Sequence, residues 1–313
     1  MIPTDLIYSI FQWLPPRVSL KFRRISTLFY TCLSSNHFAI LNVSNYFKGH
    51  HNEASFLASN RDFDEMFFLF PEPFKRLCAL HLVHVMKQEN YISLRWNDLT
   101  LDCVALPPAI RHLTYFKALE IKKTSLSGSI PEEVGMLVNL EVLEFSHNKL
   151  EGCIPESVKN LVNLRLLNLS HNKLEGRIPE GIGRLAHLIE LVLDGNRLSG
   201  TLPDALGELR CLEFLNMAEN QICGEIPRSV GNMSRLTHFI GNGNLFSGGI
   251  PDEFSQLVSL QYAVLAGNML EGGIPRAVMQ MPRLEYLNLS GNLFVPEVDV
   301  PGQVGERRMR FLI

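Results

Sequence analysis

Histidine and cysteine are the side chains of this 313-residue chain that could ligate a metal or attack a substrate. His147 and His171 occupy equivalent positions in two successive copies of a sequence repeat, and a repeating structure would stack them on one surface. A zinc site needs three or four protein ligands, so two histidines alone do not make one. We therefore expect the pair to be a solvated surface feature.

The six cysteines are scattered along the chain, at positions 32, 78, 103, 153, 211 and 223. None forms the Cys-x-x-Cys pair that is typical of zinc sites and redox centres. Their spacing does not suggest a disulfide framework either, which fits a reducing compartment.

Motifs of the common enzyme classes are absent from the sequence. It contains no Gly-x-Ser-x-Gly, Walker A, Rossmann or His-Glu-x-x-His pattern, and Gly241-Asn-Gly243 lacks a third glycine. We predict that the chain is not an enzyme and has no catalytic, cofactor-binding or metal-binding residues.

Charge and hydropathy narrow the classes of partner. The net charge of −3 argues against nucleic acid, whose protein surfaces usually carry a basic excess. No apolar run approaches the ~20 residues that cross a bilayer, so no membrane partner is expected. Leu6–Leu14 lacks the preceding basic residues and the cleavage site of a signal peptide, which predicts an intracellular protein. Residues 1–45 carry +3 and residues 113–292 carry −5, so the two parts are expected to meet different partners.

A repeat with a period of 24 runs without insertion from Leu113 to Gln280. Three residue types hold one register through it: Asn at 148, 172, 196, 220, 244, 268 and 292; Gly at 128, 152, 176, 200, 224, 248 and 272; Pro at 131, 155, 179, 203, 227, 251 and 275. Each has a physical role. The L-x-x-L-x-L segment predicts a short strand with its leucines in the core. Asn can bond backbone groups that the turning chain would bury, and Gly permits a positive φ. Pro restricts φ to a narrow negative range and removes a backbone donor.

These motifs resemble the plant-type leucine-rich repeat over residues 113–292. The resemblance implies an α/β solenoid, a horseshoe whose parallel strands line the concave face. Leu106-Pro107 falls one period before Ile130-Pro131, which predicts an atypical capping repeat at Glu89–His112. Pro296 replaces the next expected Gly, so the repeat domain is placed at 89–295 and a tail at 296–313. Gly241 occupies a core leucine position, which should weaken that repeat.

The strand residues that alternate with the core leucines should face the partner. The first outward position of each repeat becomes ring-bearing in the C-terminal half, and exposed aromatic residues in a row are typical interface anchors. Rings can also simply cover neighbouring backbone on a β-surface. Eight strands at ~4.8 Å give a face about 38 Å long, a size that favours a protein or peptide over a small molecule. The expected contact residues are Glu144, Glu190, Asp194, Phe214, Asn216, His238, Tyr262 and Tyr286.

Residues 1–45 show two helical patterns that are separated by Pro15-Pro16. Together they resemble an F-box, although Ile2, Arg17 and Phe29 depart from its usual residues. The resemblance implies a small helical domain that docks on a Skp-family adaptor of a cullin ubiquitin ligase. The motif positions that would carry that contact are Pro3, Leu6, Ile10, Leu14, Pro15 and Ile25. The alternative is a helical cap that seals the first repeat.

Residues 46–88 are expected to join the two parts rigidly, as a helical connector. Phe67-Phe68-Leu69-Phe70 should pack on the first repeat, and Phe74, Leu77, Cys78, His81, Leu82 and Val85 fit one face of a helix.

The sequence thus predicts a protein–protein interaction module, the substrate-recognition subunit of an SCF-type (Skp–cullin–F-box) ligase. Its target, held on the concave face, is not identified by the sequence. A non-ligase scaffold or signalling adaptor is the first alternative. An extracellular receptor-like recognition protein is the second, since plant-type repeats abound in receptor ectodomains.

Overall fold

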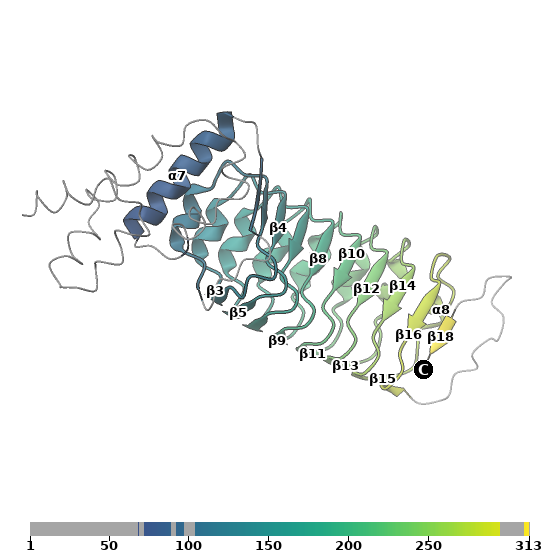
Figure 1. Ribbon diagram of the computed structural model, residues 1–313. Helices are drawn as coiled ribbons and strands as arrows, with labels where there is room; N and C mark the ends of the chain where they lie inside the picture. The colour runs from purple at the N-terminus through teal and green to yellow at the C-terminus, as the bar shows by residue number, and fades with distance from the viewer. Residues whose placement is uncertain (1–67, 69–71, 89–91, 97–103, 295–309, 313) are drawn as a thin grey trace, which may run out of the picture.

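The computed structural model describes residues 68, 72–88, 92–96, 104–294 and 310–312 of the chain. They form a solenoid of two parallel sheets with short helices between them (Figure 1). The ten-stranded concave sheet comprises β1 (Ser93–Arg95), β2 (Ala118–Glu120), β4 (Val142–Glu144), β6 (Leu166–Asn168), β8 (Glu190–Val192), β10 (Phe214–Asn216), β12 (His238–Ile240), β14 (Tyr262–Val264), β16 (Tyr286–Asn288) and β18 (Arg310–Leu312). The predicted solenoid with parallel concave strands is confirmed.

The sequence did not predict a second sheet. Each concave strand from β2 to β16 is followed by one strand of this sheet. Its eight strands are β3 (Ser127–Ser129), β5 (Lys149–Gly152), β7 (Lys173–Gly176), β9 (Arg197–Gly200), β11 (Gln221–Gly224), β13 (Leu245–Gly248), β15 (Met269–Gly272) and β17 (Leu293–Phe294). The convex side carries 3₁₀ helices η2 (Pro108–His112), η3 (Glu132–Met136), η4 (Glu156–Asn160), η5 (Glu180–Arg184), η6 (Asp204–Glu208), η7 (Arg228–Asn232) and η8 (Asp252–Gln256), and then α8 (Arg276–Met279).

The period of the sequence repeat is also the register of the concave sheet. Phe214 pairs with His238, and His238 pairs with Tyr262, so each strand position continues as a column along the molecule. A pattern in sequence thereby becomes a row of side chains in space.

The repeated asparagines form the predicted ladder between repeats. Asn196 is typical: its Oδ1 accepts the Leu174 N–H at 3.0 Å, and its Nδ2 donates to the carbonyls of Leu169 and Leu193, both at 3.0 Å. The same set recurs at every repeated asparagine, from Asn148 to Asn292. Buried backbone groups at the end of each concave strand are satisfied in this way.

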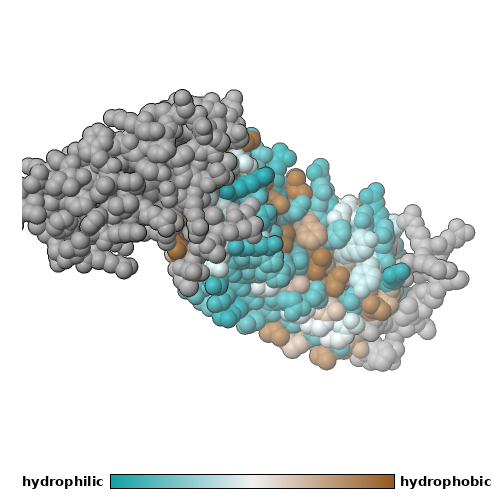
Figure 2. All heavy atoms as spheres, in the orientation of Figure 1, coloured by the Kyte–Doolittle hydropathy of each residue, from teal (hydrophilic) through white to brown (hydrophobic). Residues whose placement is uncertain are grey.

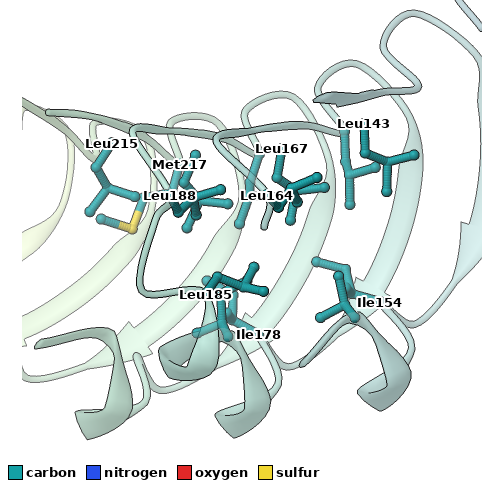
Figure 3. Close-up of a cluster of buried hydrophobic side chains, with 14 of the residues drawn as sticks. Leu143, Ile154, Leu164, Leu167, Ile178, Leu185, Leu188, Leu215 and Met217 are labelled. Atoms are coloured by element: carbon teal, nitrogen blue, oxygen red, sulfur yellow. The ribbon is translucent and has the colours of Figure 1, made fainter. Parts of the chain in front are cut away.

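Glycine and proline have the roles predicted for them. The repeated glycines, Gly128 to Gly272, have φ between 73° and 80° except Gly248 at 70°, the left-handed region that side chains disfavour. Each repeated proline precedes a convex helix, for example Pro179 with φ of −68° before η5. Leucines and isoleucines from strands and helices then fill the interior, as Figure 3 shows for Leu143, Leu167 and Ile178.

Gly241, which the sequence analysis expected to weaken its repeat, is closely surrounded by core side chains. A Cβ at this position would lie 3.1 Å from Phe246 and 3.3 Å from Leu265. Phe239 and Phe254 also lie in this part of the core, in edge-to-face contact at 5.4 Å. These rings occupy the volume that a leucine fills elsewhere, so the glycine makes room for them.

Gly241→Leu is therefore expected to destabilise the protein, although it restores the repeat consensus. Overpacking a filled core typically costs about 1–3 kcal/mol. Chemical denaturation would measure the change, with Met217→Leu, one period earlier, as the volume-conserving control. A stabilising Gly241→Leu would show that the repeat is underpacked after all.

Helix α7 (Glu72–Gln88) covers the N-terminal end of the solenoid (Figure 1). Phe74, Cys78 and Leu82 are buried in the same core as the repeats, and Leu77 packs against it. Burial raises the pKa of the Cys78 thiol, so this cysteine is a neutral core residue. Phe68 meets Trp96 edge-to-face at 4.8 Å, which confirms its predicted packing. The side chains of His81 and Val85 lie outside the described residues, as does the F-box-like segment 1–45.

The start of the solenoid contains the atypical repeat that Leu106-Pro107 predicted. Strand β1 pairs in parallel with β2, Ser93 opposite Ala118, and η2 follows Pro107 as the other convex helices follow their prolines.

The C-terminal end corrects the expectation of a plain tail from residue 296. Strand β18 extends the concave sheet, and Arg310 pairs with Tyr286, one further period along the chain. Phe311 packs against the core. Residues 310–312 therefore continue the concave sheet beyond β16.

Candidate functional site

The concave strands are only three residues long, and this limits which side chains face outward. In most strands the first and third residues project from the concave surface and the middle one is buried, as in Phe214, Leu215 and Asn216. The position two residues after the third strand residue lies where the chain has already turned. Ser146, Ser170 and Ala218, which alternate with the core leucines and were therefore expected to face outward, are buried there.

A column of four rings runs along the first strand position in the C-terminal half. The centroids of Phe214 and His238 are 5.3 Å apart, those of His238 and Tyr262 are 4.8 Å apart, and those of Tyr262 and Tyr286 are 6.5 Å apart. His238 and Tyr262 are stacked, with 12° between their planes. All four are half-buried, so each ring keeps a free edge or face. We call Phe214, His238, Tyr262 and Tyr286 the ring column.

The surface visible in Figure 2 is mostly hydrophilic over the N-terminal repeats. Apolar and intermediate residues gather toward the C-terminal repeats, which carry the ring column. Apolar and aromatic surface next to polar surface is a common character of protein-binding sites.

The N-terminal half of the concave face carries charge pairs. Arg95 contacts Glu120 at 2.8 Å, and the Lys122 ammonium lies 3.4 Å from Glu120 and 3.5 Å from Glu144. Glu144 was predicted to be an outward contact residue, but it is only 7% exposed. Its Oε1 has no hydrogen-bond partner among the described residues. The prediction of an accessible Glu144 is therefore wrong.

Glu190 and Asp194 lie in the middle of the concave face. Glu190 is exposed at the first position of β8. Asp194 is half-buried, and one of its oxygens is 3.4 Å from His171 Nε2. The His171 ring stacks on His147 at 4.4 Å, and both histidines are exposed. In the part of the chain that the structure describes, no group of three or more metal-ligating side chains gathers here or elsewhere.

Asn216 lies beside the ring column, at the end of β10. Its Oδ1 accepts the Ala218 N–H at 3.1 Å, which turns the Nδ2 group away from the backbone. Asn168 makes the same bond to Ser170 at 3.0 Å, two strands earlier. Sequence reasoning named Asn216 as a contact residue but missed this fixed orientation. The known tendency of Asn to bond the backbone two residues on was the available signal.

The flank of the concave sheet carries a further ion pair between repeats. Lys117 hydrogen-bonds Glu141 at 2.8 Å and lowers the pKa of its carboxyl, with Arg165 adding a weaker attraction. The pair is solvent-screened, so it contributes little to stability.

Two family models match the chain, and both are described as leucine-rich repeats. One covers residues 117–174, and the other covers residues 187–209 and 211–233. These segments contain the strands, asparagine ladder and glycines described above. These segments are leucine-rich repeats, and the same 24-residue motif continues on both sides of them. The models indicate a binding scaffold and no enzyme family.

Solved leucine-rich-repeat structures resemble the chain over about two thirds of its length. The ectodomain of the receptor kinase GASSHO1/SCHENGEN3 from Arabidopsis thaliana, in complex with CASPARIAN STRIP INTEGRITY FACTOR 2, has 32% identity and a TM-score of 0.60; the match covers 66% of this chain and 28% of that one. The Arabidopsis receptor kinase HAESA, in complex with the peptide hormone IDA and the co-receptor SERK1, has 32% identity and a TM-score of 0.62. The match covers 66% of this chain and 35% of that one.

A plant ice-binding protein is also similar, with 29% identity and a TM-score of 0.53; 66% of this chain and 74% of that one are covered. The chain spans only 28% and 35% of the length of these two receptor structures. Among curated proteins, none matches this sequence. Of the helices in the described leucine-rich-repeat region and α7, none combines the length and apolar character of a membrane span.

Proposed function

We propose that this chain is a recognition subunit that holds an extended peptide segment of a partner protein along the C-terminal half of its concave face. The ring column carries the proposal. Four half-buried rings in one register offer flat apolar surface over three successive strand spacings, about 14 Å. Aromatic residues in such a cluster are the usual anchors of protein interfaces.

The shape of the surface supports a peptide rather than a compact ligand. Parallel strands at ~4.8 Å make a long ribbon, whereas a small-molecule site is a closed concavity. HAESA, which shares this fold, was solved with the peptide hormone IDA, and GASSHO1/SCHENGEN3 was solved with CASPARIAN STRIP INTEGRITY FACTOR 2. Their likeness to this chain favours the same class of partner here.

We propose further that residues 1–45 dock on a Skp-family adaptor, so that the chain presents its bound target to a cullin ubiquitin ligase inside the cell. The F-box-like residues Pro3, Leu6, Ile10, Leu14, Pro15 and Ile25 support this step. The chain would position the target and leave ubiquitin transfer to its partners, so no catalytic residue is needed in it.

A pull-down with purified Skp-family adaptor tests the ligase step. Wild-type chain should be retained, and Leu14→Ala/Pro15→Ala should lose at least tenfold in retention, because truncating a buried interface anchor typically costs about 2 kcal/mol or more. The ring-column variant Tyr262→Ala is the control and should be retained like wild type. If the wild-type chain is not retained, the ligase function is refuted.

An extracellular peptide-recognition protein is the second candidate. It is favoured by the receptor ectodomains among the similar structures. It predicts secretion of the intact chain and a glycan at Asn232, which is exposed within an Asn-x-Ser sequence. A non-ligase intracellular adaptor predicts peptide capture without adaptor binding, and this capture should survive deletion of residues 1–45.

A further inference from the structure

The central ring of the column, His238, is held by a hydrogen bond that determines its neutral tautomer. Its Nδ1 lies 2.9 Å from the Thr237 hydroxyl. That hydroxyl has one proton, which it donates to the Glu213 carbonyl at 2.7 Å. A carbonyl oxygen can only accept, so the Thr237 oxygen must accept from His238. Nδ1 therefore carries the hydrogen.

The consequence is a bare acceptor on the outer side of the ring. In neutral imidazole only one nitrogen carries a hydrogen, so Nε2 has a free lone pair. No hydrogen bond from Nε2 joins it to another described residue. His238 is half-buried between Phe214 and Tyr262. The neighbouring rings cover the faces of the imidazole, and the Nε2 lone pair lies in the ring plane between them.

Asn216 supplies the complementary donor. The Ala218 N–H can only donate, so the atom that meets it at 3.1 Å must be Oδ1, and the orientation of the amide is settled. The two hydrogens of Nδ2 have no acceptor among the described residues. Phe214 lies opposite His238, and Asn216 lies opposite Ile240, so Asn216 and His238 are diagonal neighbours on adjacent strands. Strand geometry places their Cα atoms about 8 Å apart.

One acceptor between rings, at His238, and one donor diagonal to it on the adjacent strand, at Asn216, match the two hydrogen-bonding groups of an amide. An extended peptide residue directs its N–H and its C=O to the same side, as in the paired residues of a β-sheet. The concave sheet shows only side chains to a partner, so side chains must replace the backbone groups that a sheet edge would offer.

We propose that His238 and Asn216 form an amide-recognition pair: His238 Nε2 accepts an N–H, and Asn216 Nδ2 donates to a C=O, of one residue in the bound extended peptide. The ring column packs against the side chains that flank this residue. The inference rests on the proposed function, and it names the position at which the peptide backbone is read. The other ring-column neighbour, Asn288, donates to Tyr286 Oη at 3.3 Å and does not offer a free pair.

The tautomer can be tested on the free full-length chain. Long-range ¹H–¹⁵N NMR of the neutral imidazole should show a protonated Nδ1 and an unprotonated Nε2 at His238. Thr237→Val removes the acceptor that holds Nδ1–H and should shift the mixture toward the other tautomer. A wild-type His238 with the hydrogen on Nε2 overturns the inference, whatever the chain binds.

The recognition itself is tested with decapeptides selected on the full-length chain from a randomised phage-displayed library. Asn216→Asp keeps the acceptor for Ala218 N–H but replaces the free donor with a carboxylate oxygen, and His238→Phe keeps the ring stack without its nitrogens. Each should weaken the selected peptide about tenfold, the effect of leaving one buried polar group unpaired. Asn168→Asp, with the same local bond and no neighbouring ring, should stay within about twofold of wild type, since it loses no contact with the peptide.

Peptide variants identify the source of the amide. N-methylation of one backbone position should reproduce the His238→Phe loss without adding to it. If replacing a Gln or Asn side chain does so instead, the pair still reads an amide, which supports its chemistry and places it on a side chain. Peptides that bind wild type and Asn216→Asp equally overturn the inference and leave the proposed function standing. If no peptide can be selected, both are overturned.

Discussion

Asn196→Ala is expected to lower the free energy of unfolding by about 3 kcal/mol, because it leaves several buried backbone groups without partners. The side chain accepts the Leu174 N–H and donates to the carbonyls of Leu169, Leu193 and Asp194. These groups lie where two successive repeats meet. Water cannot replace the lost bonds, since Asn196 and the adjoining leucines are buried. Chemical denaturation followed by circular dichroism would measure the loss.

Asn163→Ala is the matched control for the ladder. Asn163 also bonds a backbone carbonyl of the preceding repeat, Val138 O at 2.9 Å, but it is exposed. Its removal should cost less than about 1 kcal/mol, since water can take its place. Equal losses for the two variants would show that burial in the ladder contributes nothing, and our account of the asparagine period would fail.

Tyr262→Ala is expected to weaken binding of a selected peptide about thirtyfold, while the protein stays folded. Truncation of a central aromatic anchor typically costs about 2 kcal/mol or more. Tyr262 lies between His238 and Tyr286 in the ring column, and its hydroxyl contacts Glu285 at 3.3 Å outside the core. The core residue of the same strand is Ala263, which the substitution leaves in place. Isothermal titration calorimetry would give the change in Kd.

Val192→Ala controls for a general loss of apolar surface. Val192 is half-buried on the same concave face, at the third position of β8 and outside the ring column. Its substitution should change Kd less than about threefold, because it removes little of the area that a peptide on the rings would cover. A Val192→Ala effect as large as that of Tyr262→Ala would mean that the rings are not the anchor.

The faces of this solenoid were predictable because the period is constant. Since every repeat has the same length, a residue type held at one position becomes a column in space, and the asparagine ladder, the glycine bends and the ring column all follow from that rule. The period does not determine side-chain conformation. The burial of Glu144 brings it against Lys122 of the preceding repeat, and the orientation of Asn216 depends on a local bond from the Ala218 N–H that the repeat pattern does not specify.

Two further features could not be predicted from the sequence repeat, for separate reasons. Strand β18 resumes the register at Arg310, but the preceding residues break the motif, so the periodicity alone offered no link. Gly241 departs from the consensus in isolation, and only the packing shows that Phe239, Phe246 and Leu265 surround it. The F-box-like residues 1–45, outside the described part of the chain, remain a sequence-based prediction.

The central claim is that the ring column holds the partner. The most direct measurement is the Kd of a selected peptide for wild-type chain and for Phe214→Ala/Tyr262→Ala/Tyr286→Ala, with circular dichroism melts to confirm that both are folded. We expect the triple variant to lose at least a hundredfold in affinity, which corresponds to about 2.7 kcal/mol. A folded triple variant that binds the peptide as tightly as wild type would contradict the claim.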